Sequence, residues 1–359
     1  MFGVLDKYIG RTIFCSILMT LFILVVLSGI IKFVEQLRKV GDGDYSTWNA
    51  GTFTLLTVPR DIELLFPMAG LLGSLLGLGT LATRSELLVM QAVGFSRLQV
   101  AMSVMKTAIP LLSLTIVIGE WIAPEAEQWA RNYRTEKIFG RSLIAKDYSL
   151  WAKDGNDFIH IQHIFATKNK IKEVSIYQFN AQKKLQAVIF AASGDYNSNT
   201  RQWQLSQVDS SWINNKKDII NSQSLVMDWK TNLSPEKLGV VSLGPDALAI
   251  RRLYQYIKYL NETGQESAVY TLSMWKKILS PISVAVMMLM SLSFIFGPLR
   301  SVTMGARVLI GILGGFIFYL LNEGFGNLSL VYGIVPLIAA ISPSVLFFVL
   351  SILLLIRRK

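Results

Sequence analysis

Long apolar runs constrain the fold of this chain more than any other feature of its sequence. A helix needs about 20 consecutive apolar residues to cross the hydrocarbon core of a bilayer. Only 16% of the 359 residues are charged, against about 25% in average soluble proteins, which agrees with a membrane protein. The runs predict a polytopic α-helical membrane protein with six transmembrane helices. They occupy residues 12–31, 64–82, 107–123, 278–297, 308–321 and 334–356.

The segment between the third and fourth runs follows a different pattern. Residues 124–270 are polar and contain alternating stretches such as FIHIQHI and WQLSQV, separated by turn signals. Short alternating strands at this spacing predict an antiparallel sandwich or roll. We therefore expect an all-β domain, with helical connectors, inserted between two sets of three helices. The expected domains are 1–123, 124–270 and 271–359.

A short separate helix is expected between the second and third runs, at residues 83–94. Thr83 and Glu86 fit a capping box, and Gly94 stands where a left-handed turn would end the helix after about three turns. One interpretation makes Glu86 a plain helix cap. The other makes this segment a coupling helix, in which Arg84, Glu86, Leu87 and Met90 insert into a groove of a partner.

The distribution of Lys and Arg predicts the orientation of the spans. Cytoplasmic ends of spans carry an excess of these residues, and large domains are exempt from the rule. We therefore expect both termini in the cytoplasm and the β domain outside. The residues on the predicted cytoplasmic side are Lys7, Arg11, Arg84, Arg97, Lys106, Arg300, Arg307, Arg357, Arg358 and Lys359.

Signals of enzymatic chemistry are missing from the sequence. It contains no GxxxxGK[ST] phosphate loop, no HExxH zinc motif and no GxSxG nucleophile motif. His160 and His163 would point to opposite faces of a strand, which argues against a shared metal. The single cysteine, Cys15, lies in the first run and is expected to be a small packing residue. We expect no cofactor, no metal and no catalytic site.

Basic residues gather instead at the predicted outer membrane boundary. They are Lys32, Arg38, Lys39, Arg60, Arg131 and Arg134. They either extend toward lipid headgroups, as long cationic side chains do, or form a site for an anionic amphiphile. The first helix is expected to extend to about Gly41, where Lys32 and Lys39 would share a face. Glu35 lies near the same face and would partly neutralise the pair.

Several long stretches resemble one known family, the LptF/LptG permeases of the bacterial lipopolysaccharide exporter, and within it the LptG branch. The stretches are LDKYIG at 5–10, LSGIIKFVEQLRKVG at 27–41, the segment 55–95, WIAPEAEQWARNYR at 121–134, KTNLSPEKLGVV at 230–241 and FGPLRSVTMGARV at 296–308. The resemblance implies six spans and a periplasmic β-jellyroll. It also implies an inner-membrane location and transport of lipopolysaccharide out of the outer leaflet of that membrane.

The resemblance further implies the partners and the chemistry of the site. An LptF-like permease would pair with this chain, an LptB-like ATPase dimer would dock on the coupling helices, and LptC and LptA would receive the lipid. The basic residues would bind lipid A phosphates, while acyl chains would lie against apolar residues that include Phe66 and Phe318. Two alternatives stay open: a lipoprotein-release or mechanotransmitting permease, which usually has four spans, and a non-transporting scaffold that displays a β domain.

Overall fold

The computed structural model divides the chain into two compact units, each of which is described by itself. The first unit comprises residues 1–40, 45–134 and 271–359, and the second comprises 41–44 and 135–270. The structure describes residues 3–139, 150–165, 169–180, 182–198, 200, 202–213, 219–231, 233–235, 238, 244–296 and 302–356. Arg300, Arg357, Arg358 and Lys359, which entered the orientation argument, lie outside these residues, as do parts of the stretches at 230–241 and 296–308.

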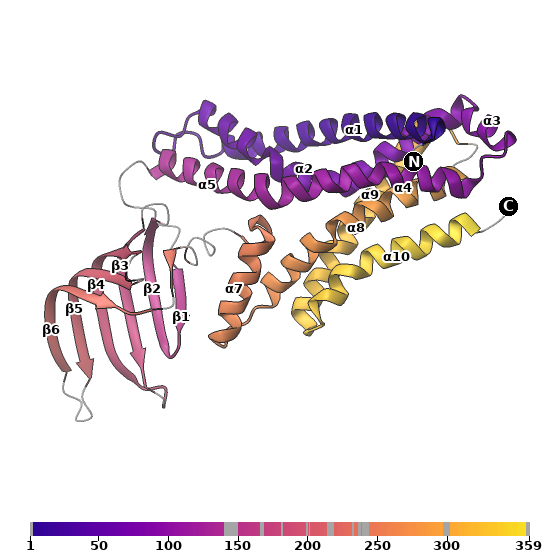
Figure 1. Ribbon diagram of the computed structural model, residues 1–359. Coiled ribbons are helices and arrows are strands. Elements are labelled where there is room, and N and C mark those ends of the chain that lie inside the picture. The colour runs from indigo at the N-terminus through magenta and orange to yellow at the C-terminus, as the bar shows by residue number, and fades with distance from the viewer. Residues whose placement is uncertain are drawn as a thin grey trace. The chain divides into compact units, whose positions relative to one another are not determined.

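Six helical segments in the described residues are long and apolar enough to cross a membrane, which confirms the number predicted from the sequence. They are α1 (Val4–Leu37), α2 (Thr47–Thr83), the continuous run Arg97–Ile138, α8 (Ala268–Phe296), α9 (Met304–Tyr332) and α10 (Pro336–Ile356). The run Arg97–Ile138 is built from α4 (Arg97–Val117), a π-helical turn η1 (Ile118–Ile122) and α5 (Ala123–Phe139). Three of the six precede the β strands and three follow them (Figure 1).

Several helices extend well beyond the apolar runs that predicted them. The α2 helix is continuous through Pro59, Pro67 and the charged residues around Arg60, although the sequence pattern is interrupted there. The α1 helix, in contrast, ends at Leu37 and is followed by a turn in which Gly41 has a φ of +102°. The prediction that α1 continues to about Gly41 was therefore wrong, because the chain turns before Lys39.

The core of the first unit joins helices from both halves of the sequence. Ile13 and Ile17 of α1, Leu78 of α2, Val104 of α4 and Met288 of α8 belong to one buried cluster. Gly73 and Gly77 permit the close approach of α1 and α2: a Cβ on Gly73 would lie 2.4 Å from the Cα atom of Ile17. This confirms the expectation that the glycine-rich part of α2 packs closely on another helix.

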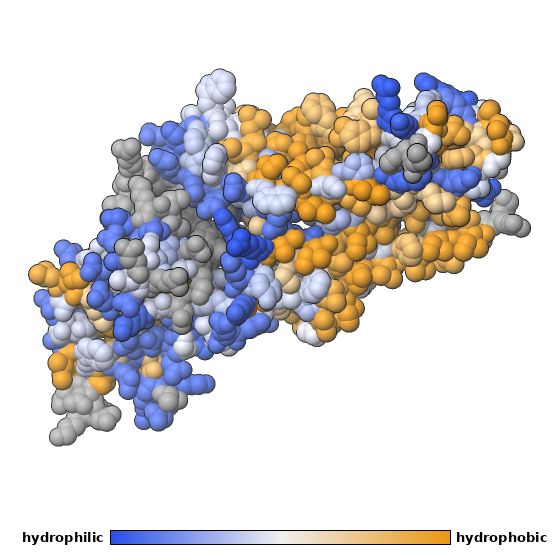
Figure 2. Space-filling model, in the orientation of Figure 1, coloured by the Kyte–Doolittle hydropathy of each residue, from blue (hydrophilic) through white to orange (hydrophobic). Residues whose placement is uncertain are grey.

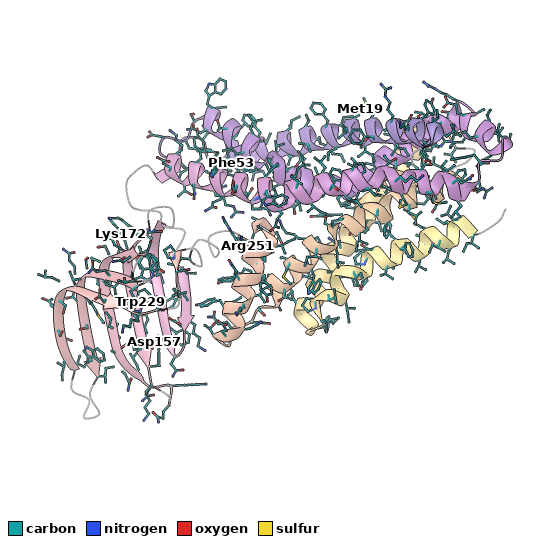
Figure 3. The ribbon with its side chains drawn as sticks, viewed as in Figure 1. Met19, Phe53, Asp157, Lys172, Trp229 and Arg251 are labelled. Atoms are coloured by element: carbon teal, nitrogen blue, oxygen red, sulfur yellow. The ribbon has the colours of Figure 1, made fainter. Side chains whose placement is uncertain are left out.

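The outer surface of the first unit is apolar, as Figure 2 shows by the orange side chains that cover its helices. On α1 the exposed side chains include Met19 at 68% and Phe22 at 69%. Figure 3 shows Met19 pointing away from the neighbouring helices. Lipid or a partner helix suits such a surface, and water does not.

The second unit contains a six-stranded antiparallel sheet whose strands follow one another in sequence order. The strands are β1 (Leu150–Asp154), β2 (Asp157–Phe165), β3 (Lys170–Phe179), β4 (Leu185–Asn197), β5 (Gln202–Ile213) and β6 (Ile219–Trp229). The predicted antiparallel strands are thus confirmed. Their order is that of a meander, and among the described strands there is one sheet rather than the two sheets with Greek-key connections of a jellyroll.

One face of the sheet is buried. The alternation of buried and exposed side chains shifts by one residue at the same level in two strands, β3 and β5. Glu173 of β3 and Gln207 of β5 both have left-handed φ values, of 51° and 54°, and both lie opposite Ala192 of β4 in the register. As a result, Ile171 and Val174, three residues apart, are both buried. A strict period of two cannot describe these strands, because a residue in the left-handed region rotates the side chains that follow it.

An amphipathic helix, α7 (Ile250–Glu262), also belongs to the second unit. Its Tyr259 hydroxyl donates to the carbonyl of Lys153 at 3.1 Å, which ties the helix to β1. Leu253, Tyr256 and Leu260 on the same face are buried. Burial raises the pKa of Tyr259 to about 12 and also raises the pKa of Tyr256. Both hydroxyls therefore stay neutral in the folded unit at physiological pH.

Candidate functional site

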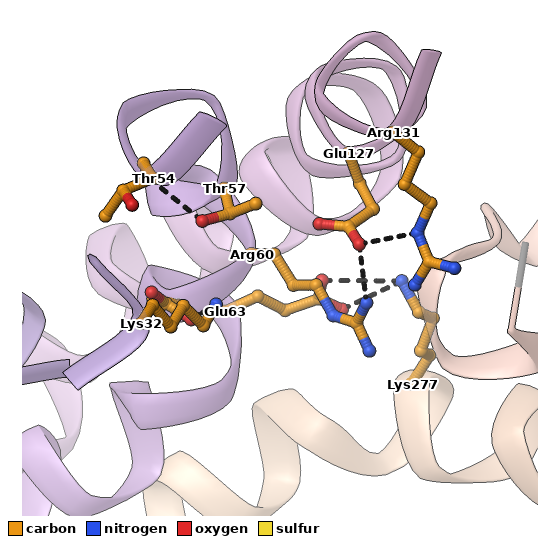
Figure 4. A network of polar contacts seen from close by, with 9 residues as sticks. Lys32, Thr54, Thr57, Arg60, Glu63, Glu127, Arg131 and Lys277 are labelled. Carbon is orange, nitrogen blue, oxygen red and sulfur yellow. Dashed lines mark hydrogen bonds and ion pairs between the residues drawn. The ribbon is translucent and has the colours of Figure 1, made fainter. Parts of the chain in front are cut away.

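The C-terminal part of α1 lies beside a group of charged residues that come from four different helices (Figure 4). Charged side chains inside spanning helices are rare and usually functional, because the hydrocarbon core solvates them poorly. The group is held together by four ion pairs. Its members are Lys32 of α1, Arg60, Asp61 and Glu63 of α2, Glu127 and Arg131 of α5, and Lys277 of α8.

The α2 helix organises the group by directing consecutive charges at different neighbours. Successive residues of an α-helix differ by about 100° in direction, since a turn takes 3.6 residues. Asp61 consequently faces α1, Arg60 faces α5, and Glu63 faces α8 and the π-helical turn. The break in the apolar pattern of α2 is therefore the place where this helix is connected to three others.

Lys32 forms an ion pair with Asp61. The Lys32 side chain is 29% exposed, whereas that of Asp61 is only 4% exposed. Only one carboxylate oxygen of Asp61 is used: Oδ2 is buried and has no hydrogen-bond partner among the described residues. The sequence suggested Glu35 as the acid near Lys32, but Glu35 is exposed on α1 and the ion pair is made with α2.

Arg60 and Arg131 share a single carboxylate. Arg60 Nη1 lies 3.1 Å from Oε1 of Glu127, and Arg131 Nε lies 2.9 Å from the same oxygen. Glu127 is buried, with a side chain that is 6% exposed. Two guanidinium groups on one carboxylate leave an excess of positive charge at this point of the unit.

Glu63 and Lys277 connect the two halves of the helical unit. Their Oε1 and Nζ atoms are 3.0 Å apart, and both side chains are largely buried. Lys277 also donates to the carbonyl of Gly119 in the π-helical turn, at 3.4 Å. A Cβ on Gly119 would lie 2.9 Å from Oε1 of Glu63, so a residue without a side chain is needed for this approach.

The remaining predicted cations lie near this group but are held differently. The guanidinium of Arg134 stacks over the ring of Phe53, 4.8 Å from its centroid. Arg38 is exposed immediately after α1, and Lys39 lies in the following turn. Because α1 ends at Leu37, the prediction that Lys32 and Lys39 share a face of one helix was wrong.

The two aromatic residues expected to meet acyl chains are buried within this chain. Phe66 is 0% exposed in the main core, and Phe318 packs edge-on against Phe347 with ring centroids 5.2 Å apart. Their rings are covered by neighbouring helices of the same unit. The apolar side chains that remain accessible in this part of the unit include Leu27 and Ile31 of α1 and Leu64 of α2.

The expected coupling helix is present but shorter than predicted and begins differently. The α3 helix covers Glu86–Ala92, and Gly94, with a φ of +95°, follows it as expected. The capping box was wrong: Thr83 is the last residue of α2 and its hydroxyl donates to carbonyls of α2, while Ser85 precedes α3 in a left-handed conformation. The predicted apolar run ended at residue 82, and α2 includes one residue more, so Thr83 closes α2 instead of starting α3.

Glu86 makes a contact with the first span in place of the predicted cap. It accepts a hydrogen bond from the hydroxyl of Tyr8 of α1, at 2.8 Å. Leu87 is buried in the core of the unit and Met90 packs against that core. Arg84 is the residue that ends α2. The exposed apolar side chains near α3 are Leu88, Val89 and Val93.

The other sequence features do not form a second site. His163 is buried 4.0 Å from Glu173, while His160 stacks against Trp151, so the two histidines have different surroundings. In the part of the chain that the structure describes, no group of three His, Cys, Asp or Glu side chains is arranged to hold a metal. Cys15, expected to be a small packing residue, is exposed on α1 and is not buried against the other described helices.

Comparison with known proteins agrees with the architecture and identifies the family. The sequence model of one protein family, described as lipopolysaccharide export system permease LptF/LptG, matches residues 7–357. The chain belongs to the LptF/LptG family. It is 58% identical to the lipopolysaccharide export system permease protein LptG of Escherichia coli K12 over 358 residues, which cover 100% of this chain and 99% of that protein.

Two further relatives show that this chain is more similar to LptG proteins than to an LptF protein. The chain is 48% identical to the LptG protein of Haemophilus influenzae over the full length of both chains. Its similarity to the LptF protein of Escherichia coli K12 is weaker, at 26% identity over 53% of this chain. Together with six candidate spans, these relatives indicate a multi-pass inner-membrane protein and argue against the four-span alternative.

Four acidic or basic residues of the site were not among those expected from the sequence: Asp61, Glu63, Glu127 and Lys277. Asp61 and Glu63 interrupt the apolar pattern of α2, whereas Glu127 and Lys277 left no such signal. Lys277 directly precedes the fourth apolar run, and Glu127 lies in a polar stretch after the third, so neither interrupts an apolar pattern. The signal that indicates them is indirect. An acidic residue four positions before Arg131 on a helix predicts an i,i+4 pair, and Glu63 within a span predicts a basic partner on another helix.

Proposed function

We propose that this chain is a permease subunit of an exporter that extracts lipopolysaccharide from the outer leaflet of the bacterial inner membrane. The observation that carries the proposal is the group of cations around Lys32, on the surface of a six-span unit whose relatives are named lipopolysaccharide export permeases. Phosphate groups are strong acceptors for Lys and Arg, so these cations suit the phosphates of lipid A.

The proposed binding residues play two different parts. Lys32, Arg38, Lys39, Arg60, Arg131 and Arg134 would contact the phosphates, and the exposed apolar face of α1 would lie against the acyl chains. Phe66 and Phe318 are covered by helices of this chain, so we assign them the role of shaping the surface that the lipid meets. Because protein interiors are close-packed, the size and position of these two rings determine where the helices that cover them lie.

Energy would come from a separate ATPase subunit that docks on α3. This helix presents Leu88, Val89 and Val93 to the exterior, and Glu86 connects it to Tyr8 of the first span. Described residues near this end include Lys7, Arg11, Arg97 and Lys106, which favours a cytoplasmic location by the charge rule. Both termini would then be cytoplasmic, and an LptB-like dimer would be the partner that reaches α3.

The β unit would lie in the periplasm and hand the lipid onward. Its last strand, β6, is an edge of the described sheet and exposes Ile219, Ile220, Leu225 and Val226. An exposed edge of this kind can accept a strand from another sheet. We therefore propose a jellyroll-like module that pairs with LptC- and LptA-type domains, while an LptF-like permease completes the membrane part.

The binding proposal is tested by lipopolysaccharide extraction with variants of Lys32 in the assembled complex. Lys32→Asp should impair binding most, since it places a second carboxylate beside Asp61, and Lys32→Arg should be milder because it keeps the charge. Lys7→Asp is a matched control, since it makes the same change of charge on the same helix near its other end. Unchanged extraction by a Lys32→Asp complex that assembles and hydrolyses ATP would contradict the proposed site.

A further inference from the structure

Asp61 has a feature that the ion pair with Lys32 does not explain. Its carboxylate is buried, and Oδ2 has no hydrogen-bond partner among the described residues. A buried carboxylate oxygen without a donor is unfavourable, so structures usually supply one. The nearest polar groups one and two turns earlier in α2 are committed elsewhere: the hydroxyls of Thr57 and Thr54 each donate to a backbone carbonyl at 2.9 Å.

The cations at this place already have carboxylate partners within the chain. Lys32 is paired with Asp61, and Arg60 and Arg131 are both paired with Glu127. The side chains of Lys32 and Arg131, at 29% and 28% exposure, are accessible enough for an external group to reach them. An incoming phosphate at Lys32 therefore competes with Asp61 for the ammonium group.

We propose that Asp61 is an internal counter-ion that competes with the phosphate of the lipid for Lys32. This inference rests on the proposed function. When a phosphate binds Lys32, Asp61 loses its cation and remains buried with both oxygens unsatisfied. Removing one partner of a buried pair is unfavourable, so the exchange weakens lipid binding and favours release of the lipid.

The same exchange discriminates among anionic lipids. A phospholipid with one phosphodiester offers a single charge to replace Asp61, whereas a glycolipid with two phosphate groups can pair with Lys32 and with neighbouring cations such as Arg134 at once. Specificity often arises from an unfavourable element that only the correct ligand overcomes. Asp61 is thus a specificity-determining residue that excludes ordinary phospholipids from Lys32.

The alternative is that Asp61 only keeps Lys32 in place within apolar surroundings. The two roles predict opposite effects of removing the charge. Under competition, Asp61→Asn frees Lys32 and strengthens lipid binding. Under simple positioning, the same change misplaces Lys32 and weakens binding.

The experiment compares lipopolysaccharide affinity in the complete permease–ATPase complex, held in nanodiscs of phosphatidylethanolamine and phosphatidylglycerol. The variants are wild type, Asp61→Asn, Lys32→Gln and the double variant, with fluorescently labelled lipopolysaccharide as the probe. We expect Asp61→Asn to lower Kd by about threefold to tenfold, the range of a typical net hydrogen bond that no longer competes. It should also increase the phosphatidylglycerol that co-purifies with the complex.

Controls separate this inference from the proposed function. Glu35→Gln removes the same charge from the exposed surface one turn after Lys32 and should leave Kd unchanged. Asp61→Ser carries the same expectation as Asp61→Asn, so the test does not depend on one variant. The double variant should bind like Lys32→Gln alone, because the competition requires Lys32.

Each result decides one of the two claims. Unchanged or weaker binding by Asp61→Asn and Asp61→Ser, with weaker binding by Lys32→Gln, would overturn the counter-ion role and leave the lipid site intact. An effect of Asp61→Asn that persists in the double variant would also overturn it. If Lys32→Gln does not weaken binding, the lipid site itself is wrong.

Discussion

The helical unit and the β unit solve the same problem, the burial of polar groups, by different means. The helical unit pairs opposite charges, as Glu63 does with Lys277 and Glu127 with two arginines. The β unit buries aromatic side chains whose polar atoms reach backbone carbonyls, as Trp203 does with Leu233 and Tyr259 with Lys153. Charges are costly to bury and are retained where they act, which is the pattern expected if the helical unit binds the phosphates of the lipid.

The largest effect should come from breaking the ion pair that connects the two halves of the helical unit. Lys277→Met leaves Glu63 buried without its cation, and we expect a loss of about 3–5 kcal/mol in stability. The loss is measured as a lower unfolding temperature of the complex in detergent. Lys276→Met is the matched control: its partner Glu323 is 46% exposed, so the loss should be clearly smaller. Equal losses of stability in the two variants would contradict the claim that the buried pair contributes more than the partly exposed pair.

A pH titration should find a comparable effect in the β unit, although no buried ion pair is involved. Burial raises the pKa of Tyr259 to about 12, whereas the unfolded value is 10.0. A raised folded pKa means that the stabilisation is complete below pH 10 and is lost as the pH rises toward 12. A shift of this size corresponds to about 2–3 kcal/mol.

The alkaline transition is followed by tyrosinate absorbance and by proteolysis of the β unit in the full chain. Tyr259→Phe should reduce the pH dependence between 10 and 12, and Tyr256, whose pKa burial also raises, contributes to the dependence that remains. The exposed Tyr254, 63% accessible in the same helix, provides the control, because Tyr254→Phe should leave the transition in place. An alkaline transition that Tyr259→Phe leaves unchanged would refute the assignment of that transition to Tyr259.

A smaller effect is expected from the neutral hydrogen bond of Trp203. Its Nε1 donates to the carbonyl of Leu233 at 2.7 Å, and the residue is 1% exposed. Trp203→Phe leaves that carbonyl without its donor and should reduce stability by about 1–3 kcal/mol. Protease resistance of the β unit measures the loss. Trp212→Phe, at a position 44% exposed, should have little effect, and a larger loss there would overturn this reasoning.

The smallest effect on stability should follow from Tyr8→Phe at the α3 end. The Tyr8 side chain is 44% exposed and loses one hydrogen bond, to Glu86, so the stability change should be the smallest of these variants. The informative readout is ATP hydrolysis stimulated by lipopolysaccharide, which should fall if this contact transmits motion between α3 and α1. Stimulation equal to wild type would limit Tyr8 to a structural role.

The sequence predicted those parts of the fold that depend on local patterns. Apolar length identified the six spans, period-two alternation identified the strands, and Gly94 identified the end of α3. It could not predict which helices meet, so it assigned Glu35 in place of Asp61 to Lys32. The predicted capping box was wrong for a similar reason. The residues from Thr83 to Glu86 fit the start of a helix, but Thr83 is the last residue of α2.

The candidate site was only partly accessible to sequence reasoning. The cations were visible as charges near span ends, but their buried carboxylate partners come from positions 29 and 67 residues apart in the chain. Such pairings depend on tertiary packing. The burial of Phe66 could not be predicted either, because an apolar residue in a spanning helix faces lipid or protein according to its neighbours.

The central claim, that lipid phosphates meet the cations around Lys32, is tested most directly by photocrosslinking at two positions of the same unit. A photoreactive residue is placed at Ile31, 56% exposed beside Lys32, and at Val93, 85% exposed after α3. During ATP-driven transport, Ile31 should capture lipopolysaccharide, the capture should fall with Lys32→Gln, and Val93 should capture none. Equal capture at both positions, or capture at Ile31 that is indifferent to Lys32→Gln, would contradict the account.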